Sequence, residues 1–145
     1  MRIAVLSDTH DRLPKSLPPR FVGADEIWHL GDVCAPATLD ALTRLAIPLR
    51  IVRGNCDHCL DWPLELSFEL EGFQILLTHI PPRTAPHGVD LLFHGHTHVP
   101  RKEHVGATQF FNPGCITRPN RGAPASWAWL SLNRGTVPDW KLQGL

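Results

Sequence analysis

Apolar residues along this chain gather in short runs, and most of these runs end at a polar cluster or a turn. The first, Arg2 to Leu6, has the length and composition of a buried strand. Similar runs predict strands over residues 26–30 and 49–52. Between them, the leucines of residues 35–46 recur at helical spacing, and Pro36 suits the first turn of a helix. Strand, helix and strand in this order predict a βαβ unit at the start of the chain.

The second half of the chain predicts antiparallel hairpins instead of helices. Three turn sequences, at 71–72, 106–107 and 133–135, each separate two apolar or alternating runs. Residues 80–88 contain three prolines and no helical period, so they predict a loop before a further strand at 89–93. The hairpin strands expected from the other runs are 64–70, 73–77, 101–105, 108–111, 127–132 and 136–141.

Length and charge narrow the class of protein. At 145 residues the chain is long enough to bury a sizeable core, and no repeat or linker divides it, so we expect a single domain over residues 1–145. The 14 basic and 14 acidic residues balance, which gives no indication of nucleic-acid binding. No apolar run approaches the roughly 20 residues of a membrane span. The first apolar run lacks a signal-peptide cleavage pattern, so we expect a cytoplasmic protein.

The chain has four cysteines, which we expect to be free thiols in a cytoplasmic protein. Two of them, Cys56 and Cys59, have the C-x-x-C spacing that occurs in zinc and redox sites. A zinc ribbon needs a second such pair, however, and the sequence has none. The pair alone therefore gives weak support for a zinc or redox role.

Polar side chains with metal-binding chemistry repeatedly follow the predicted strands. Two of them, His96 and His98, are two residues apart, so in extended backbone their side chains project to the same side. The carboxyl ends of strands in open α/β sheets are where binding sites assemble. A polar turn is the alternative for any single cluster, but the five clusters together predict a site. They are Asp8/His10, Asp32, Asn55, His79 and His96/His98.

These residue types suit a pair of metal ions. Carboxylate, imidazole and amide ligands favour divalent ions of intermediate hardness, such as Mn, Fe, Zn or Ni. A carboxylate can bridge two ions, which lie roughly 3.5–4 Å apart in hydrolytic sites of this kind. The two aspartates leave a surplus of positive charge, which would attract a phosphate group. A water held between the ions would become a hydroxide nucleophile at neutral pH.

The order of the clusters resembles the signature of the calcineurin-like metallophosphoesterases, which runs D-x-H, G-D, G-N-[HC]-[DE], a lone His and G-H-x-H. The G-N-C-D form and a late N-P-G resemble the small bacterial and archaeal phosphodiesterases of that family. The resemblance implies an α/β fold, a four-layer α/β/β/α sandwich of two mixed sheets, here trimmed of some helices. The matching residues are Asp8-Thr9-His10, Gly31-Asp32, Gly54-Asn55-Cys56-Asp57, His79, Gly95-His96-Thr97-His98 and Asn112-Pro113-Gly114-Cys115.

The resemblance also implies a role for each position. Two divalent ions are expected, with manganese the first choice and nickel, iron, zinc or magnesium as alternatives. Asp32 would bridge the ions, while Asn55 and His96 would also act on the phosphate. Substrate contacts are expected from Asn55, Cys56 and Arg118. One ion would be bound by Asp8, His10, Asp32 and His98, and the other by Asp32, Asn55, His79 and His96.

Several residues depart from the family pattern. Cys56 stands where many members have a histidine that donates a proton, and a thiol is a weaker donor than an imidazolium. Asp57, which orients that histidine in other members, is expected to lack its usual partner. Asp11 replaces a glycine and adds negative charge near the site. The missing helix at 80–88 should leave that side of the site open or available to another subunit.

The remaining histidines and arginines leave alternatives open. His29 and His94 lie within or at the end of predicted strands, and we interpret both as core histidines. Arg118 and Arg121 could contact a phosphate or form a solvated basic loop.

The function predicted from the sequence is that of a metal-dependent phosphoesterase, more specifically a phosphodiesterase that uses a metal-bridging hydroxide on a small phosphoester. The alternative is a non-catalytic scaffold or binding module on the same fold. A homo-oligomer is compatible with either.

Overall fold

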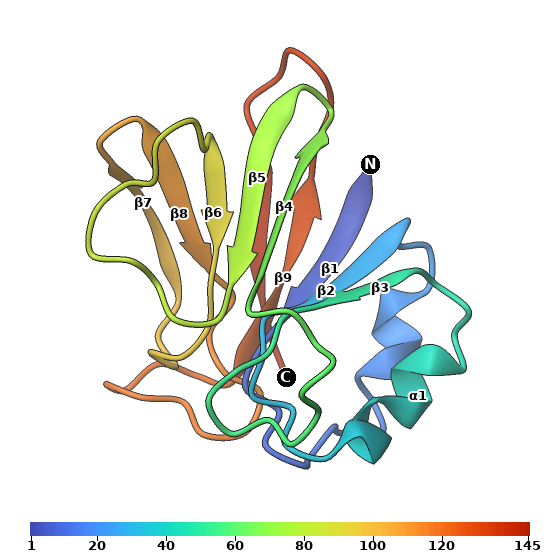
Figure 1. Cartoon of the computed structure of the whole chain (residues 1–145). Helices are drawn as coiled ribbons and strands as arrows, with labels where there is room; N and C mark the ends of the chain where they lie inside the picture. The colour runs from blue at the N-terminus through green and yellow to red at the C-terminus, as the bar shows by residue number, and fades with distance from the viewer.

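The computed structural model describes residues 1–145, and its strands form two mixed five-stranded sheets that pack face to face (Figure 1). Every strand predicted from the sequence is present, with bounds that differ by a few residues. The first sheet contains β1 (Arg2–Leu6), β2 (Glu26–His29), β3 (Leu49–Ile51), β9 (Ser126–Ser131) and β10 (Asp139–Gly144). The second contains β4 (Glu65–Leu70), β5 (Phe73–Thr78), β6 (Leu91–Phe93), β7 (Arg101–Val105) and β8 (Thr108–Asn112).

Each sheet contains three neighbouring strands that run parallel to one another. The orders are β10-β9-β1-β2-β3 and β4-β5-β6-β8-β7. Strands β1, β2 and β3 are parallel, and so are β5, β6 and β8. Parallel neighbours end at the same edge of their sheet, and the loops that follow them gather in the lower half of Figure 1.

The main core lies between the two sheets. Trp28 of β2 is fully buried, and its ring meets Phe68 and Phe93 of the second sheet edge-on, at 5.6 and 5.2 Å between centroids. Phe93 in turn stacks on Phe111 at 4.9 Å. Aromatic pairs of this kind add roughly 0.5–1.5 kcal/mol each to the burial of their apolar area. This core fixes how the two sheets, and therefore their carboxyl-end loops, face one another.

All helical segments cover the outer face of the first sheet (Figure 1). There they bury a second apolar cluster, in which Phe21 packs against Trp127 at 4.8 Å between ring centroids. The segments are the 3-10 helices η1 (Pro18–Phe21) and η2 (Pro36–Leu39) and the α-helix α1 (Asp40–Thr43).

The helix predicted over residues 35–46 is shorter than expected. It consists of a 3-10 turn followed by a single turn of α-helix. Ala46 has a left-handed backbone (φ 54°), which ends the helical path just before Pro48. The leucine spacing was correct, because Leu39 and Leu42 are the buried residues of these two turns.

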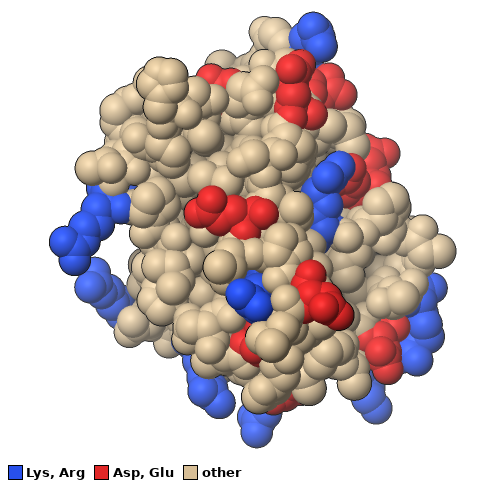
Figure 2. Space-filling view, viewed as in Figure 1, with Lys and Arg blue, Asp and Glu red and all other residues tan.

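The outer face of the second sheet has no helix, as the prolines of residues 80–88 predicted. A small apolar cluster lies there, formed by Leu76, Leu92 and Phe110 with partly buried Val89 and Val105. The sandwich is therefore trimmed on this side. None of the helices has the length and apolar character needed to cross a membrane. On the face shown in Figure 2, basic and acidic residues are interspersed.

Candidate metal centre

The seven predicted ligands lie at the carboxyl ends of five strands. Those from the first sheet follow β1, β2 and β3, and those from the second follow β5 and β6. Contacts between the two sets join the loops of both sheets into one site. The residues are Asp8 and His10 after β1, Asp32 after β2, Asn55 after β3, His79 after β5, and His96 and His98 after β6.

One half of the site is a tight group of two carboxylates and two imidazoles. His98 Nε2 lies 3.1 Å from Asp8 Oδ1 and 3.4 Å from His10 Nε2. His10 Nε2 also lies 3.8 Å from Asp32 Oδ2. One ligand atom from each of these four residues lies within 4.8 Å of those of the others. Such a group can place four ligands around a single ion.

The other half is centred on the second oxygen of Asp32. His79 Nε2 lies 3.4 Å from Asp32 Oδ1, and the rings of His79 and His96 are 5.3 Å apart. His96 Nδ1 is 3.0 Å from Asn55 Oδ1 at the exposed mouth of the site. Asp32 therefore presents Oδ2 to one half and Oδ1 to the other, which is the arrangement that a bridging carboxylate needs.

Backbone carbonyls determine which ring nitrogen of two histidines faces the site. His98 Nδ1 is 2.6 Å from the carbonyl oxygen of Arg118, and His79 Nδ1 is 2.7 Å from that of Leu30. A carbonyl oxygen only accepts hydrogen bonds, so each Nδ1 carries a proton and donates it. In the neutral rings, Nε2 is then a lone pair directed into the site. Anchoring of this kind is typical of histidines that bind metals.

These lone pairs face carboxylate oxygens, so in each contact two hydrogen-bond acceptors face one another with no donor between them. Neutral His98 presents Nε2 to Asp8 Oδ1, and neutral His79 presents Nε2 to Asp32 Oδ1. Both His79 Nε2 and Asp8 Oδ1 are buried without a hydrogen-bond partner. Buried acceptors that face one another are unfavourable unless a proton or a cation lies between them. The residues present therefore fit a divalent cation at this place.

Two of the groups, Asp32 and His10, have the protonation state that a metal requires. Burial raises the pKa of Asp32, but the contact with the His79 side chain and the hydrogen bond from the Cys56 amide outweigh it and hold that pKa well below its usual range, so Asp32 is ionised. Burial lowers the pKa of His10 despite the neighbouring carboxylates, which favours the neutral imidazole that a metal requires. The contact with Asp8 outweighs burial and raises the pKa of His98, and the contact with Asp32 does the same against burial for His79, so without a metal these contacts favour a proton on each ring.

The backbone at the site is strained where the ligands leave their strands. Asp8, Asp32, His96 and His98 all have left-handed backbone, with φ of 58°, 56°, 66° and 58°. For residues other than glycine this conformation costs of order 1–3 kcal/mol each and clusters at functional sites. Close approach adds a further restraint: a Cβ on Gly54 would collide with Asp32.

Asp57 joins two of the site loops, a role that the sequence analysis missed. Instead of lacking a partner, its carboxylate accepts three backbone N–H groups. They come from Gly54 at 2.6 Å, Cys34 at 2.7 Å and Asp32 at 3.0 Å. The carboxylate thereby ties the loop after β3 to the loop after β2 and fixes the backbone of Asp32. An aspartate two residues after Gly-Asn can accept from its own turn, which is the only signal the sequence offers.

Asp11 likewise has a structural role. Its Oδ1 accepts the backbone N–H of Ala35 at 2.7 Å and the hydroxyl of Thr38 at 3.4 Å, at the start of η2. The Asp11 carboxylate, expected to add negative charge near the site, instead stabilises the loop before that helix.

The two histidines interpreted as core residues are fully buried. His29 contacts the hydroxyl of Thr9 at 3.1 Å and accepts the N–H of Gly31 at 3.2 Å. His94 lies against Asn112 and Arg101 at 3.3 Å. Burial lowers the pKa of each to about 4, so both are neutral near neutral pH.

The residues predicted to contact substrate lie at the rim of the centre. Cys56 is exposed; its backbone N–H donates to Asp32 Oδ1 at 2.9 Å, and burial together with the charge of Asp32 raises the pKa of its thiol. Arg118 gives its carbonyl to His98, while its guanidinium makes no hydrogen bond or ion pair within the chain.

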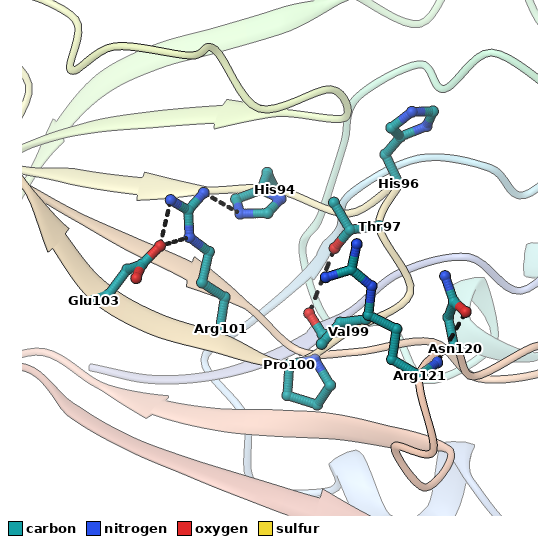
Figure 3. A pocket seen from close by; sticks show the side chains of 9 residues that line it. All are labelled: His94, His96, Thr97, Val99, Pro100, Arg101, Glu103, Asn120 and Arg121. Carbon is teal, nitrogen blue, oxygen red and sulfur yellow. Dashed lines mark hydrogen bonds and ion pairs between the residues drawn. The ribbon is translucent and has the colours of Figure 1, made fainter.

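Two open cavities border ligands of the centre. One has a volume of about 460 Å³ and is bordered by His96, Asn120, Arg101 and Arg121 (Figure 3). The other, of about 500 Å³, is bordered by Arg53, Asn55 and His79. Both cavities therefore reach ligands of the half that contains Asn55, His79 and His96.

Comparisons with known proteins show the family of this chain. A model of the calcineurin-like phosphoesterase superfamily domain matches residues 1–135. The chain is 32% identical over 160 residues to phosphodiesterase YfcE of Escherichia coli K12, covering 90% of this chain and 87% of that protein. It is 36% identical over 136 residues to the probable metallophosphoesterase MJ0623 of Methanocaldococcus jannaschii, covering 82% and 70%.

Solved structures show the same architecture. The structure of YfcE from E. coli superposes with a TM-score of 0.75 at 30% identity, over 90% of this chain and 88% of that one. Wild-type Vps29 from Entamoeba histolytica, complexed with Zn²⁺, gives a TM-score of 0.78 at 22% identity, over 99% and 98%. The second likeness concerns the fold alone.

Proposed function

Because the chain belongs to the calcineurin-like phosphoesterase superfamily, we propose that it hydrolyses small phosphodiesters with two divalent metal ions, manganese being the first choice. The chain is a metal-dependent phosphoesterase; the diester preference, the number of ions and the residue roles are our proposal. The proposal rests on two pairs of acceptor atoms that face one another: His79 Nε2 lies opposite Asp32 Oδ1, and His98 Nε2 lies opposite Asp8 Oδ1.

Asp32 is proposed to bridge the two ion positions, with one carboxylate oxygen directed to each. When bound, the ions would supply a water acidified between them as the nucleophile, and positive charge for the phosphoryl oxygens. The anchored tautomers of His79 and His98 hold their Nε2 lone pairs ready without reorganisation. The proposed ligands are Asp8, His10, Asp32 and His98 for one ion, and Asp32, Asn55, His79 and His96 for the other.

Asn55 and His96 are proposed to orient the phosphate. They are hydrogen-bonded to each other at 3.0 Å and exposed at the mouth of the site, so an entering phosphate meets them first. The amide N–H₂ of Asn55 can donate to a phosphoryl oxygen. Arg118, whose guanidinium has no partner in the chain, can pair with another oxygen through charge-assisted hydrogen bonds.

The diester preference is supported by the two cavities. A phosphodiester has organic substituents on two of its oxygens, and both must leave the centre without a clash. The cavity beside His96 and the cavity beside Asn55 and His79 are lined by different residues, and each can receive one substituent. A monoester would need only one.

Cys56 limits which leaving groups depart easily. Its raised thiol pKa keeps it protonated at neutral pH, but a thiol is a weak proton donor to a departing alkoxide. We therefore expect the enzyme to favour substrates whose leaving group departs without much protonation, such as aryl esters.

The test measures bound metal and turnover together. Protein stripped with EDTA is reloaded with Mn²⁺, the ions per chain are counted, and hydrolysis of bis(p-nitrophenyl) phosphate is compared with that of p-nitrophenyl phosphate. We expect two ions per chain, restoration of activity by Mn²⁺ and preference for the diester. Asp32→Ala should lower kcat/KM by at least the order of 10²–10³-fold, the loss typical when a group that positions transition-state charge is removed.

A matched control is Asp61→Ala, which removes an exposed carboxylate from a nearby loop. It should retain wild-type turnover. If the protein binds two ions but shows no turnover that depends on Asp32, the catalytic proposal fails and the scaffold alternative is correct.

A further inference from the structure

Cys34 and Cys56 belong to different loops, yet their sulfur atoms lie together on one side of His10. Cys34 follows β2 and Cys56 follows β3. One ligand atom each from His10, Cys34 and Cys56 lies within 4.8 Å of the other two. Cys34 Sγ is 3.7 Å from His10 Nδ1. Cys59, the other half of the C-x-x-C spacing, is not part of this cluster.

The spacing of these atoms suits a tetrahedral ion. Zinc binds thiolate sulfur at about 2.3 Å and imidazole nitrogen at about 2.0–2.1 Å, so neighbouring ligand atoms in a tetrahedron lie roughly 3.5–3.8 Å apart. The 3.7 Å between Cys34 Sγ and His10 Nδ1 is such an edge. Only a small movement of the exposed Cys56 side chain would close the remaining edges.

Carboxylates hold the backbone of both cysteines in place. The N–H of Cys34 donates to Asp57 at 2.7 Å, and the N–H of Cys56 donates to Asp32 at 2.9 Å. The two thiols are therefore brought together before any ion binds, and the nearby negative charge favours a cation. Cys56 is exposed, which provides the route of entry.

We propose that Cys34, Cys56 and His10 form a binding site for thiophilic cations, such as Zn²⁺, Cd²⁺ or Cu⁺, separate in chemistry from the Asp/His centre. Soft thiolates select these ions, whereas carboxylate and imidazole ligands accept Mn²⁺. On binding, each thiol releases its proton to solvent as a sulfur–metal bond forms, and no electrons are transferred. His10 uses Nδ1 here and turns Nε2 toward Asp32, so one ring adjoins both sites.

Cadmium is the probe that tests this site without reference to catalysis. Reduced, metal-free protein is titrated with Cd²⁺ while the thiolate-to-cadmium charge-transfer absorption is followed. We expect saturation of that band at one ion per chain. In the same protein, Cd²⁺ should slow the iodoacetamide labelling of Cys56 but not of Cys59, as read by peptide mass spectrometry, and Mn²⁺ should slow neither.

Variants identify the ligands. Cys34→Ser and Cys56→Ser should each lose about half of the band and weaken Cd²⁺ binding by at least about ten-fold, while Cys59→Ser, the matched control, should bind as the wild type does. The proposal is overturned if the band is unchanged in Cys34→Ser and Cys56→Ser, or if Cys59→Ser loses as much. Should a variant fail to fold, the wild-type labelling still decides: equal labelling of Cys56 with and without Cd²⁺ refutes the site.

Discussion

Replacing Asp57 by asparagine tests whether one carboxylate holds the loops of the metal centre together. The carboxylate accepts three backbone N–H groups, from Gly54, Cys34 and Asp32, at 2.6, 2.7 and 3.0 Å. A hydrogen bond to a charged group contributes roughly 1.5–3 kcal/mol. Asparagine keeps one accepting oxygen but loses the charge and turns an N–H₂ toward backbone donors. We therefore expect Asp57→Asn to lower the free energy of unfolding by about 2–4 kcal/mol.

The assay is thermal unfolding of the metal-free and Mn²⁺-loaded protein. For a chain of this length, 1 kcal/mol shifts Tm by about 3–4 °C, so the loss should be roughly 6–16 °C. Because Asp57 positions the backbone of Asp32, Mn²⁺ affinity should also fall by about 10–100-fold, as is usual for groups that support metal ligands. Asp61→Asn, in an exposed loop position, is the control. If Asp57→Asn unfolds within about 0.5 kcal/mol of that control, the carboxylate does not hold these loops.

Three further predictions concern the site and the core. Gly54→Ala should abolish stoichiometric Mn²⁺ binding, measured by calorimetry, because a Cβ there would displace the Asp32 carboxylate. His29 has a folded-state pKa of about 4, below its ordinary 6.5, so the unfolded chain binds the extra proton and stability present above about pH 6.5 is lost as pH falls toward 4. The His29 contribution to the loss should be roughly 1.4 kcal/mol per pH unit, so His29→Gln should make this part of the Tm–pH curve less steep, while His94 still contributes its share; an equally steep curve would contradict the assignment. Cys56→His should speed the hydrolysis of esters with poor leaving groups and change aryl esters little, and equal effects on both would argue against a proton-donor position.

The strands and their turns were predictable because they depend on local patterns. The hairpin signal at Glu71 and Gly72 and the alternation on either side of it give β4 and β5 almost to the residue. The helix after Pro36 was overestimated, since leucine spacing does not reveal the left-handed backbone of Ala46 that ends it. Local pattern thus predicts which element forms better than where it ends.

The site was predictable only in part, for a physical reason. Polar residues after strands must converge when the strands are parallel, so the positions of Asp32 and His98 follow from the pattern. The contacts that hold these side chains in place do not follow from the pattern. The carbonyl of Leu30 accepts a hydrogen bond from His79, which is 49 residues further along the chain. The free thiols of Cys34 and Cys56 lie close together although they belong to different loops. Contacts of this kind depend on how the two sheets are packed, and no short stretch of sequence records that.

The carbonyl anchors of His79 and His98 have a consequence for how this centre tolerates mutation. Each ring is oriented by a main-chain oxygen, of Leu30 and Arg118, which every amino acid at those positions would also provide. Substitution there can alter packing or charge but cannot delete the anchor. Asp57 is different, because its three contacts all pass through one side chain. We expect variation to be tolerated at the two anchor positions with the imidazoles still aimed correctly, while a single codon change at Asp57 loosens two loops at once.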